Sequence, residues 1–322
     1  MHTEIPGIAK WGESIVITTI CLNPALDKTA TTSQLLAGGL NILENIRHDV
    51  GGKGINVALA LGRMGVECAC IGCVGTMDEE LFSEALEREN VRFLPFSTLG
   101  RVRTNLKLLE KNTGIITELN ELGPVMNRAQ QMQFISMLRQ EVRHSEYVIF
   151  SGRLPAGCAD TMYEECLQAL PKHQCIVDTS GNALLAALSR SPLLIKPNLF
   201  ELEAAAGCAL PSIEEIKRAA IDLVGQGAQN VVVSMGGDGA LCTDGNKTVY
   251  SPAIRVEVKS TVGAGDTMLA GMAAGLYQKM DMPEAFRIGM AAAAAAVMTE
   301  GTLPMHKKDF ERLLPSVVQY DI

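Results

Sequence analysis

Two glycine-rich stretches, each leading into a helical pattern, carry the clearest chemical signal of the sequence. Residues 51–56 read Gly-Gly-Lys-Gly-Ile-Asn, and residues 260–266 read Ser-Thr-Val-Gly-Ala-Gly-Asp. Glycines let the backbone approach a ligand closely, and the free amides at a helix start favour an anion. The first stretch adds the charge of Lys53. The second adds Asp266, which is predicted to act as a general base beside the anion site.

Each stretch also has a plainer interpretation. Residues 51–56 fit a loop-to-helix turn with a solvated lysine, and Asp266 fits a helix cap. The first stretch is not a Walker A loop, because Gly54 stands where Ser or Thr is required, and its spacing is not that of the dinucleotide fingerprint. A cap does not require two preceding glycines, so the second stretch favours catalysis.

Two further motifs follow short apolar strand patterns. Asn198 and Glu201 are three residues apart, so at a helix start both can face one solvent pocket and orient metal-bound water. They fit equally well an N-cap with Glu at the third helical position. Residues 234–239 read Ser-Met-Gly-Gly-Asp-Gly. They fit a nucleotide-binding loop, but taken alone they favour a hairpin turn.

Composition limits the classes of protein and of partner. The chain has 322 residues, 47% apolar and 20% charged, and a net charge of −8. A packed core is therefore expected, and neither nucleic acid nor an anionic membrane is an expected partner. No stretch predicts a signal peptide or a membrane span. The nine irregularly spaced cysteines fit a cytoplasmic protein, with Cys70 and Cys73 filling a buried strand rather than forming a metal or redox pair.

The elements that must position the motifs alternate between short apolar strands and helices. Strands are predicted at residues 15–21, 68–74, 147–150, 174–177, 193–195 and 231–234. Helices are predicted at 55–64, 78–89, 159–170, 182–187, from 201, 213–226, 266–277 and 283–299. This alternation predicts an α/β fold with a mostly parallel sheet. Two regions, about 25–50 and 92–120, lack helical periodicity and are predicted to form a small β-sheet over one edge of the main domain.

Together and in this order, the motifs resemble those of the PfkB, or ribokinase-like, family of carbohydrate kinases, from about residue 18 to the end. Gly-Gly-Lys-Gly-x-Asn and Gly-Ala-Gly-Asp match the two family signatures. Residues 23–27 (Asn-Pro-Ala-Leu-Asp), 101–107 (Arg-Val-Arg-Thr-Asn-Leu-Lys) and 117–120 (Thr-Glu-Leu-Asn) resemble the hexose-phosphate branch, most of all its 1-phosphofructokinase and tagatose-6-phosphate kinase groups. The sequence departs from the branch at Val102, where Thr is usual, and at Arg153, where Ser or Asn is usual.

The resemblance implies one ribokinase-like three-layer domain over residues 1–322, with the two irregular regions as a discontinuous β lid that pairs in a homodimer. It implies ATP-dependent phosphorylation of a ketohexose phosphate. Fructose 1-phosphate is the expected substrate, and tagatose 6-phosphate and fructose 6-phosphate are the alternatives. The complete set of catalytic motifs disfavours a non-catalytic sugar-phosphate-binding regulator. The cations Lys53, Arg103 and Lys107 disfavour a kinase for an unphosphorylated sugar.

The resemblance also assigns roles to the motif residues. Asp266 is expected to take the proton from the attacking hydroxymethyl group, and Asn198 and Glu201 to hold Mg²⁺ through water. The residues expected to bind the sugar phosphate are Asp27, Gly52, Lys53, Asn56, Arg103 and Asn105, with Lys53 and Arg103 on its phosphate. The residues expected to bind ATP or to stabilise the transferred phosphoryl are Lys196, Asn198, Ser234, Met235, Gly236, Gly237, Asp238, Gly239, Gly263, Ala264 and Gly265. Arg153 is predicted to supplement the phosphate contacts, unless it is a surface arginine lying along apolar neighbours.

Overall fold

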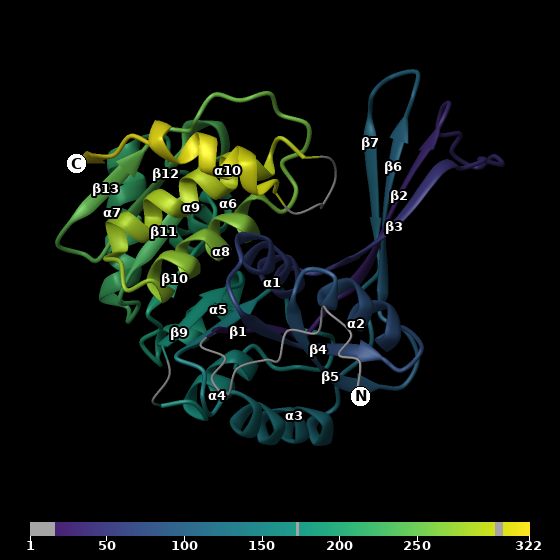
Figure 1. The fold of residues 1–322 in the computed structure, drawn as a ribbon, viewed down its shortest axis with the longest axis horizontal. Coiled ribbons are helices and arrows are strands. Elements are labelled where there is room, and N and C mark those ends of the chain that lie inside the picture. Colours follow the sequence, from purple (N-terminus) through teal and green to yellow (C-terminus); the bar gives the residue numbers. More distant parts are fainter. Residues whose placement is uncertain (1–16, 172–173, 300–304) are drawn as a thin grey trace, which may run out of the picture.

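A large, mostly parallel sheet forms the centre of the protein (Figure 1). The structure is a computed structural model and describes residues 17–171, 174–299 and 305–322. The strands of this sheet are β1 (Ile17–Cys21), β4 (Cys68–Gly75), β5 (Val91–Thr98), β8 (Tyr147–Ser151), β9 (Gln174–Asp178), β10 (Leu194–Ile195), β11 (Val231–Ser234), β12 (Ala240–Thr243), β13 (Thr248–Ser251) and β14 (Tyr320–Asp321). Their order is β14-β13-β12-β11-β10-β9-β8-β1-β4-β5.

The central strands are parallel because the chain crosses over the sheet between them. β1, β4, β5 and β8 to β11 pair in parallel, whereas β11 to β14 pair antiparallel. β1, β4 and β8 are buried at every position, as expected for apolar runs that are covered on both faces. The predicted mostly parallel sheet is confirmed. Residues 15 and 16 of the first predicted strand lie outside the described residues.

Helices cover both faces of the sheet and complete three layers. One face carries α1 (Lys53–Met64), α2 (Glu79–Glu87), α8 (Ala264–Tyr277) and α9 (Met282–Ala296). The other face carries α3 (Arg128–Glu141), α4 (Met162–Gln168), α5 (Gly181–Leu188), α6 (Leu199–Ala206) and α7 (Ile213–Gly225), while α10 (Lys307–Leu313) packs on α9. The small residues of α8 and α9 permit very close packing, since a Cβ at Gly271 would lie 2.8 Å from the Ala292 Cβ.

A second, four-stranded sheet extends away from the body as a lid (Figure 1). Its order is β3 (Glu44–Gly51), β2 (Ala25–Thr32), β6 (Arg103–Glu110) and β7 (Ile116–Asn120). β2 and β6 pair in parallel, so the two halves of the lid come from separate parts of the chain. The prediction that the second half begins at about residue 92 is wrong. β5 pairs with β4 over eight positions as the edge of the large sheet, and it lacks helical periodicity because it is a half-exposed edge strand.

Several elements differ from the sequence predictions. α3 and the hairpin of β12 and β13 were not predicted, and α6 begins at Leu199, two residues before the predicted start. Cys70 and Cys73 are buried in β4 as free thiols, which confirms that they fill a strand. Within the described ranges, no helix is long and apolar enough to cross a membrane.

Candidate active site

The carboxyl ends of four neighbouring parallel strands bring polar side chains to one edge of the large sheet. β8 ends at Ser151, β9 at Asp178 and β11 at Ser234, and Lys196 directly follows β10. The sheet order changes direction beside these ends, because β4 lies on one side of β1 and β8 on the other. Ligands of open α/β sheets bind at such a switch point. The fold therefore predicts a ligand site here.

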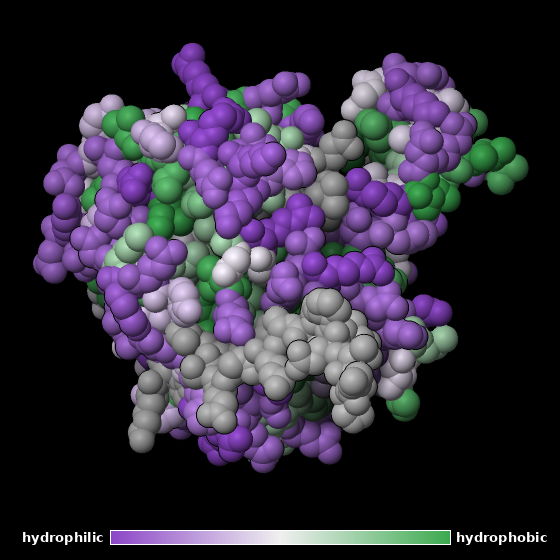
Figure 2. Space-filling model, in the orientation of Figure 1, coloured by the Kyte–Doolittle hydropathy of each residue, from purple (hydrophilic) through white to green (hydrophobic). Residues whose placement is uncertain are grey.

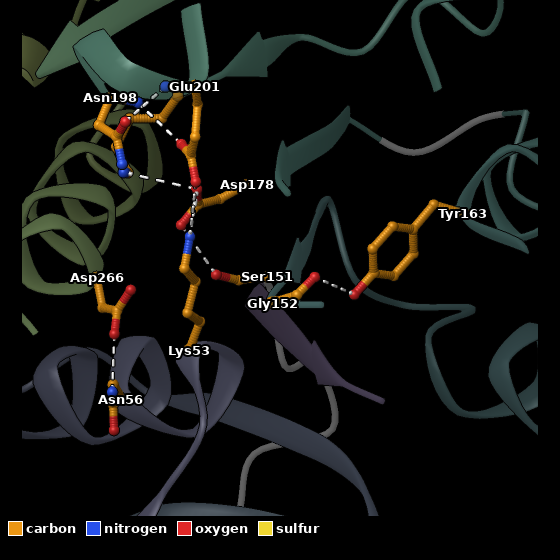
Figure 3. A network of polar contacts seen from close by, with 10 residues as sticks. Lys53, Asn56, Ser151, Gly152, Tyr163, Asp178, Asn198, Glu201 and Asp266 are labelled. Atoms are coloured by element: carbon orange, nitrogen blue, oxygen red, sulfur yellow. Dashed lines mark hydrogen bonds and ion pairs between the residues drawn. The ribbon is translucent and has the colours of Figure 1, made fainter. Parts of the chain in front are cut away.

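Asp178 is the centre of a buried ionic network at this edge (Figure 3). Its carboxylate is fully buried and lies 3.4 Å from the Lys53 Nζ and 3.6 Å from the Lys196 Nζ. The Ser151 hydroxyl donates a hydrogen bond of 3.2 Å to it. Burial alone would raise the pKa of Asp178, but Lys196, Lys53 and Ser151 together hold it below its ordinary value. The buried Asp178 carboxylate thus keeps its negative charge and holds the side chains of Lys53 and Lys196 in position.

The first glycine-rich stretch places Lys53 at the start of α1. Gly52 caps this helix with a φ of 114°, and a Cβ at Gly54 would lie 2.5 Å from the Ile20 carbonyl oxygen. Both glycines are therefore required by the close approach of α1 to β1. Besides Asp178, Lys53 Nζ lies 3.8 Å from the Glu201 carboxylate. Burial would lower the pKa of Lys53, but the facing carboxylates outweigh it and raise that pKa. The Lys53 side chain stays 37% exposed but pairs with two carboxylates, which favours a ligand site over a plain solvated lysine.

The second glycine-rich stretch places Asp266 in the first turn of α8. Gly263 precedes the helix with a φ of 77°, and a Cβ at Gly265 would lie 3.2 Å from the Lys196 Nζ. The Asp266 side chain makes no capping hydrogen bond to its helix. Instead it accepts a hydrogen bond of 2.7 Å from the Asn56 amide of α1 (Figure 3). The interpretation of Asp266 as a helix cap is therefore wrong.

The surroundings of Asp266 favour a neutral carboxyl group. Burial raises its pKa from 3.8 to about 6, and the negative charge of Asp178 adds to this rise. Lys53, Lys196 and the Asn56 hydrogen bond oppose it. A carboxylate with this pKa is ionised near neutral pH and still basic enough to accept a proton, as a general base requires.

Asn198 and Glu201 form the capping box that the sequence left as one of two alternatives. The Asn198 side-chain oxygen accepts from the backbone amide of Glu201 at 2.8 Å. In return, the Glu201 carboxylate accepts from the backbone amide of Asn198 at 2.9 Å. This exchange fixes both side chains at the start of α6. Asn198 also bridges to Ser234, so α6 begins beside the end of β11. The two interpretations are compatible, because each side-chain oxygen has a second lone pair.

The turn between β11 and β12 contains the fourth motif. Residues 236–238 form a 3₁₀ turn, and β11 and β12 pair antiparallel on either side of it. The hairpin interpretation of residues 234–239 is confirmed. Gly236 and Gly239 have φ values of 59° and 94°, and a Cβ at Gly239 would lie 2.1 Å from the Ser251 carbonyl oxygen. This tight turn lies beside Asn198, where it borders the same edge of the sheet.

A second polar group lies on the lid. Asp27 of β2 is buried and accepts a hydrogen bond of 2.8 Å from the Asn105 amide of β6. The Arg103 guanidinium donates to the side-chain oxygen of Asn105 at 2.9 Å, so the three residues form a hydrogen-bonded chain along one face of the lid. Burial raises the pKa of Asp27 and lowers that of Arg103. Lys107 lies two positions after Asn105 on β6, and its charge also acts on Asp27.

The structure thus brings the predicted residues together as two groups. Lys53, Asn56, Lys196, Glu201 and Asp266 surround one ionic network, whereas Arg103, Asn105 and Asp27 line the lid. Sequence reasoning missed Asp178 and Ser151. Both are polar residues at the ends of predicted apolar strands, and the rule that ligands bind at carboxyl ends of parallel strands would have singled them out.

Comparison with known proteins identifies the family. The pattern described as pfkB family carbohydrate kinase matches residues 13–308. The 1-phosphofructokinase of Bacillus subtilis (strain 168) is 33% identical over 305 residues, covering 94% of this chain and 98% of the relative. That of Vibrio cholerae is 33% identical over 290 residues, covering 88% and 90%. The crystal structure of phosphofructokinase-2 from Escherichia coli in complex with potassium superposes with a TM-score of 0.87 at 30% identity, covering 94% and 99%.

The chain therefore belongs to the pfkB family of carbohydrate kinases. Both glycine-rich stretches, the buried Asp266 and the lid fall within the matched residues. A further structure of the Escherichia coli enzyme, with a TM-score of 0.86, is described as its tetrameric inhibited form.

Proposed function

We propose that this protein transfers the γ-phosphoryl group of ATP to fructose 1-phosphate and so forms fructose 1,6-bisphosphate. The observation that carries the proposal is the placement of Asp266. Its buried carboxylate, with a pKa of about 6, lies at a glycine-flanked helix start beside Lys53 and Lys196. The names of the relatives support this choice of substrate, and the cationic lid suits a sugar that already carries a phosphate.

The residues of the ionic network divide the chemistry between them. Asp266 accepts the proton of the attacking sugar hydroxyl as its oxygen bonds to the γ-phosphorus and ADP departs. The amides of residues 263–265 stabilise the charge on the transferred group. Lys196, held by Asp178, binds the phosphates of ATP. The contacts of Lys53 with Asp178 and Glu201 favour a place on the transferred group rather than on the phosphate of the sugar.

The sugar lies between the first helix and the lid. Asn56 Oδ1 is buried and has no hydrogen-bond partner among the described residues, so it can accept from a sugar hydroxyl. Asp27 offers a carboxylate from the lid, and Gly52 offers a backbone position without a side chain. Arg103 and Asn105 face the same space from β6, where the guanidinium can bind the substrate's phosphate. Residues 234–239 border the nucleotide together with Asn198.

The residues at the start of α6 suit Mg²⁺. Glu201 supplies one carboxylate and Asn198 an amide oxygen. The described residues contain no cluster of three or more acidic, histidine or cysteine side chains that could enclose a metal ion by themselves. Mg²⁺ usually keeps several waters and takes one or two carboxylates plus substrate phosphates, so this donor set fits it. Asn198 and Glu201 would hold the ion through water. When bound, the ion supplies positive charge to the phosphates of ATP.

The outer part of the lid supports a homodimer. Figure 2 shows apolar surface near the end of the lid that lies away from the body. The exposed apolar residues of the lid are Leu36, Leu40, Ile42, Ile46, Ile115, Ile116 and Leu119. Apolar patches of this kind mark association surfaces. We extend the proposal to a dimer through the lid, located in the cytoplasm, where the nine free thiols stay reduced.

A panel of acceptors tests the proposed substrate. ADP release is measured with fructose 1-phosphate, tagatose 6-phosphate, fructose 6-phosphate and unphosphorylated fructose, and kcat/KM is compared. The highest value is expected for fructose 1-phosphate, with the Asp266→Asn variant as the inactive control. A higher value for another sugar phosphate reassigns the substrate. Turnover of fructose alone would refute the role of the lid cations.

A further inference from the structure

Arg153 lies beside the proposed active site, and the sequence leaves open whether it contacts phosphate or is a surface arginine. It follows β8 and the fixed residue Gly152, whose amide donates to the Asp178 carbonyl at 2.9 Å. The Gly152 carbonyl accepts from the Tyr163 hydroxyl at 2.9 Å (Figure 3). A Cβ at Gly152 would lie 3.6 Å from the Lys53 Cβ. The backbone that carries Arg153 is thus held directly against the ionic network.

Asn23 ties this loop to the lid. Its side-chain amide donates to the Leu154 carbonyl, the residue after Arg153, at 3.5 Å. Its own carbonyl accepts from the Arg103 Nε at 3.3 Å. Asn23 therefore contacts the Arg153 loop with its side chain and Arg103 with its backbone. The Arg103 side chain and the backbone next to Arg153 therefore contact the same residue, although the two arginines are 50 positions apart in the sequence.

Neither arginine forms an ion pair with a carboxylate in the part of the chain that the structure describes, although the charge of Asp27 acts on Arg103. Arg103 contacts only amide oxygens, and Arg153 makes no ion pair. Nearby arginines behave differently: Arg101 lies 2.7 Å from Asp78, and Arg128 lies 2.7 Å from Glu165. In a chain with 36 acidic residues, two neighbouring cations that form no ion pair with the described residues leave room for an external anion.

The two charges also interact electrostatically. Burial lowers the pKa of Arg103, the charge of Asp27 opposes this, and the positive charge of Arg153 adds a smaller lowering. Like charges repel each other, and a dianion between the two guanidinium groups would offset that repulsion. Arginine is well suited to this role, because its planar fork can bind phosphate through two parallel hydrogen bonds.

We propose that Arg153 and Arg103 together form the binding site for the phosphate group that the sugar already carries. This inference rests on the proposed function and adds a specificity-determining residue to it. The nucleotide is bound elsewhere, at the ends of β10 and β11, and β9 separates those ends from β8. Arg153 lies on the β1 side, where the chain continues through Asn23 into the lid. It therefore contacts the sugar phosphate and not ATP.

The test compares Arg153→Ser and Arg153→Lys with a matched control, Arg143→Ser. Arg143 is exposed and precedes β8, so it lies at the opposite end of the same strand and its loss changes the net charge equally. KM and kcat are measured at low and high ionic strength for the sugar phosphate that the unmodified enzyme turns over best. KM for ATP is measured alongside.

Arg153→Ser is expected to raise KM for the sugar phosphate about tenfold at low salt and less at high salt, because part of the attraction is screened charge. Arg153→Lys keeps the charge but loses the fork, so about a threefold rise is expected. Neither substitution should change KM for ATP. A sugar-phosphate KM for Arg153→Ser equal to that of the unmodified enzyme, or an equal rise in Arg143→Ser, overturns the proposal.

A binding measurement separates this inference from the proposed function. If the unmodified enzyme phosphorylates none of the three sugar phosphates, the proposed function fails, but the anion site still stands or falls by itself. Inorganic phosphate is then titrated into the intact protein by calorimetry. Weaker binding in Arg153→Ser than in Arg143→Ser supports the site. Equal affinity in both variants refutes it.

Discussion

Replacing Asp266 with asparagine is expected to make the protein more stable while removing most of its activity. The carboxylate is buried, and its charge is opposed by burial and by Asp178. Asparagine has nearly the same shape and keeps an oxygen to accept the Asn56 hydrogen bond of 2.7 Å, but it cannot ionise. The loss of the base is expected to lower kcat by a factor on the order of 10²–10⁴.

The gain in stability follows from the pKa difference between the two states. The pKa of Asp266 is 3.8 when the chain is unfolded and about 6 in the folded protein. Each pKa unit corresponds to about 1.4 kcal/mol, so the ionised group destabilises the folded state by about 3 kcal/mol above pH 6. This cost declines as the pH falls from about 6 to about 4, because the folded protein is then protonated, and it is absent below both pKa values.

Urea unfolding of the unmodified protein and of Asp266→Asn provides the assay. The variant's advantage in the free energy of unfolding should grow by about 2 kcal/mol between about pH 4.5 and pH 8. Asp160→Asn, which changes an exposed carboxyl group, is the control and should show no such growth. An advantage that does not depend on pH, or a variant less stable than the unmodified protein at pH 8, would refute the reasoning.

Three further perturbations test other parts of the site. Arg103→Ala should raise KM for the sugar phosphate by about 10- to 150-fold and leave KM for ATP unchanged in steady-state kinetics, since one charge-assisted contact is lost; equal rises in both constants would contradict its placement. Asp178→Asn should destabilise the fold by about 3–5 kcal/mol in urea unfolding, because two lysines lose their buried partner. It should also move the acidic limb of the pH profile of kcat/KM to lower pH, because Asp266 loses a negative neighbour. An unmoved limb counts against this electrostatic coupling. Gly54→Ala should destabilise the protein by about 1–3 kcal/mol in thermal or urea unfolding, because its Cβ would lie 2.5 Å from the Ile20 carbonyl oxygen, and unchanged stability would show that this close approach is not needed.

Elements with a strong local pattern were predictable, and those stabilised by distant contacts were not. β4 and β8 read as apolar runs because both of their faces are covered. β5 was assigned to the lid, since only its pairing with β4 shows which sheet it joins. α3 was missed although two local signals mark it: its capping box of Asn127 and Gln130, and the helical spacing of the buried residues Phe134, Ile135 and Leu138. The hairpin of β12 and β13 is likewise fixed by pairing, since β12 pairs antiparallel with β11 and β13 with β12.

The sequence by itself determined the glycine positions, the helix starts and the residue types of the two main motifs. These features depend on neighbours along the chain: Gly52 and Gly263 permit positive φ values, and Asp266 follows within the same helix turn. A resemblance based on such short motifs could therefore identify the kinase class before any contact was known.

Only the tertiary structure decided which charges meet. Asp178 is an ordinary aspartate in the sequence, yet it contacts Lys53, which is 125 positions earlier, and the buried Lys196. The pKa of Asp266 depends on burial and on that network. Arg153 and Arg103 interact electrostatically although 50 positions separate them, and Asn23 contacts both Arg103 and the residue after Arg153. Electrostatic energies depend on distance and burial in space, and the local sequence specifies neither of them for segments so far apart.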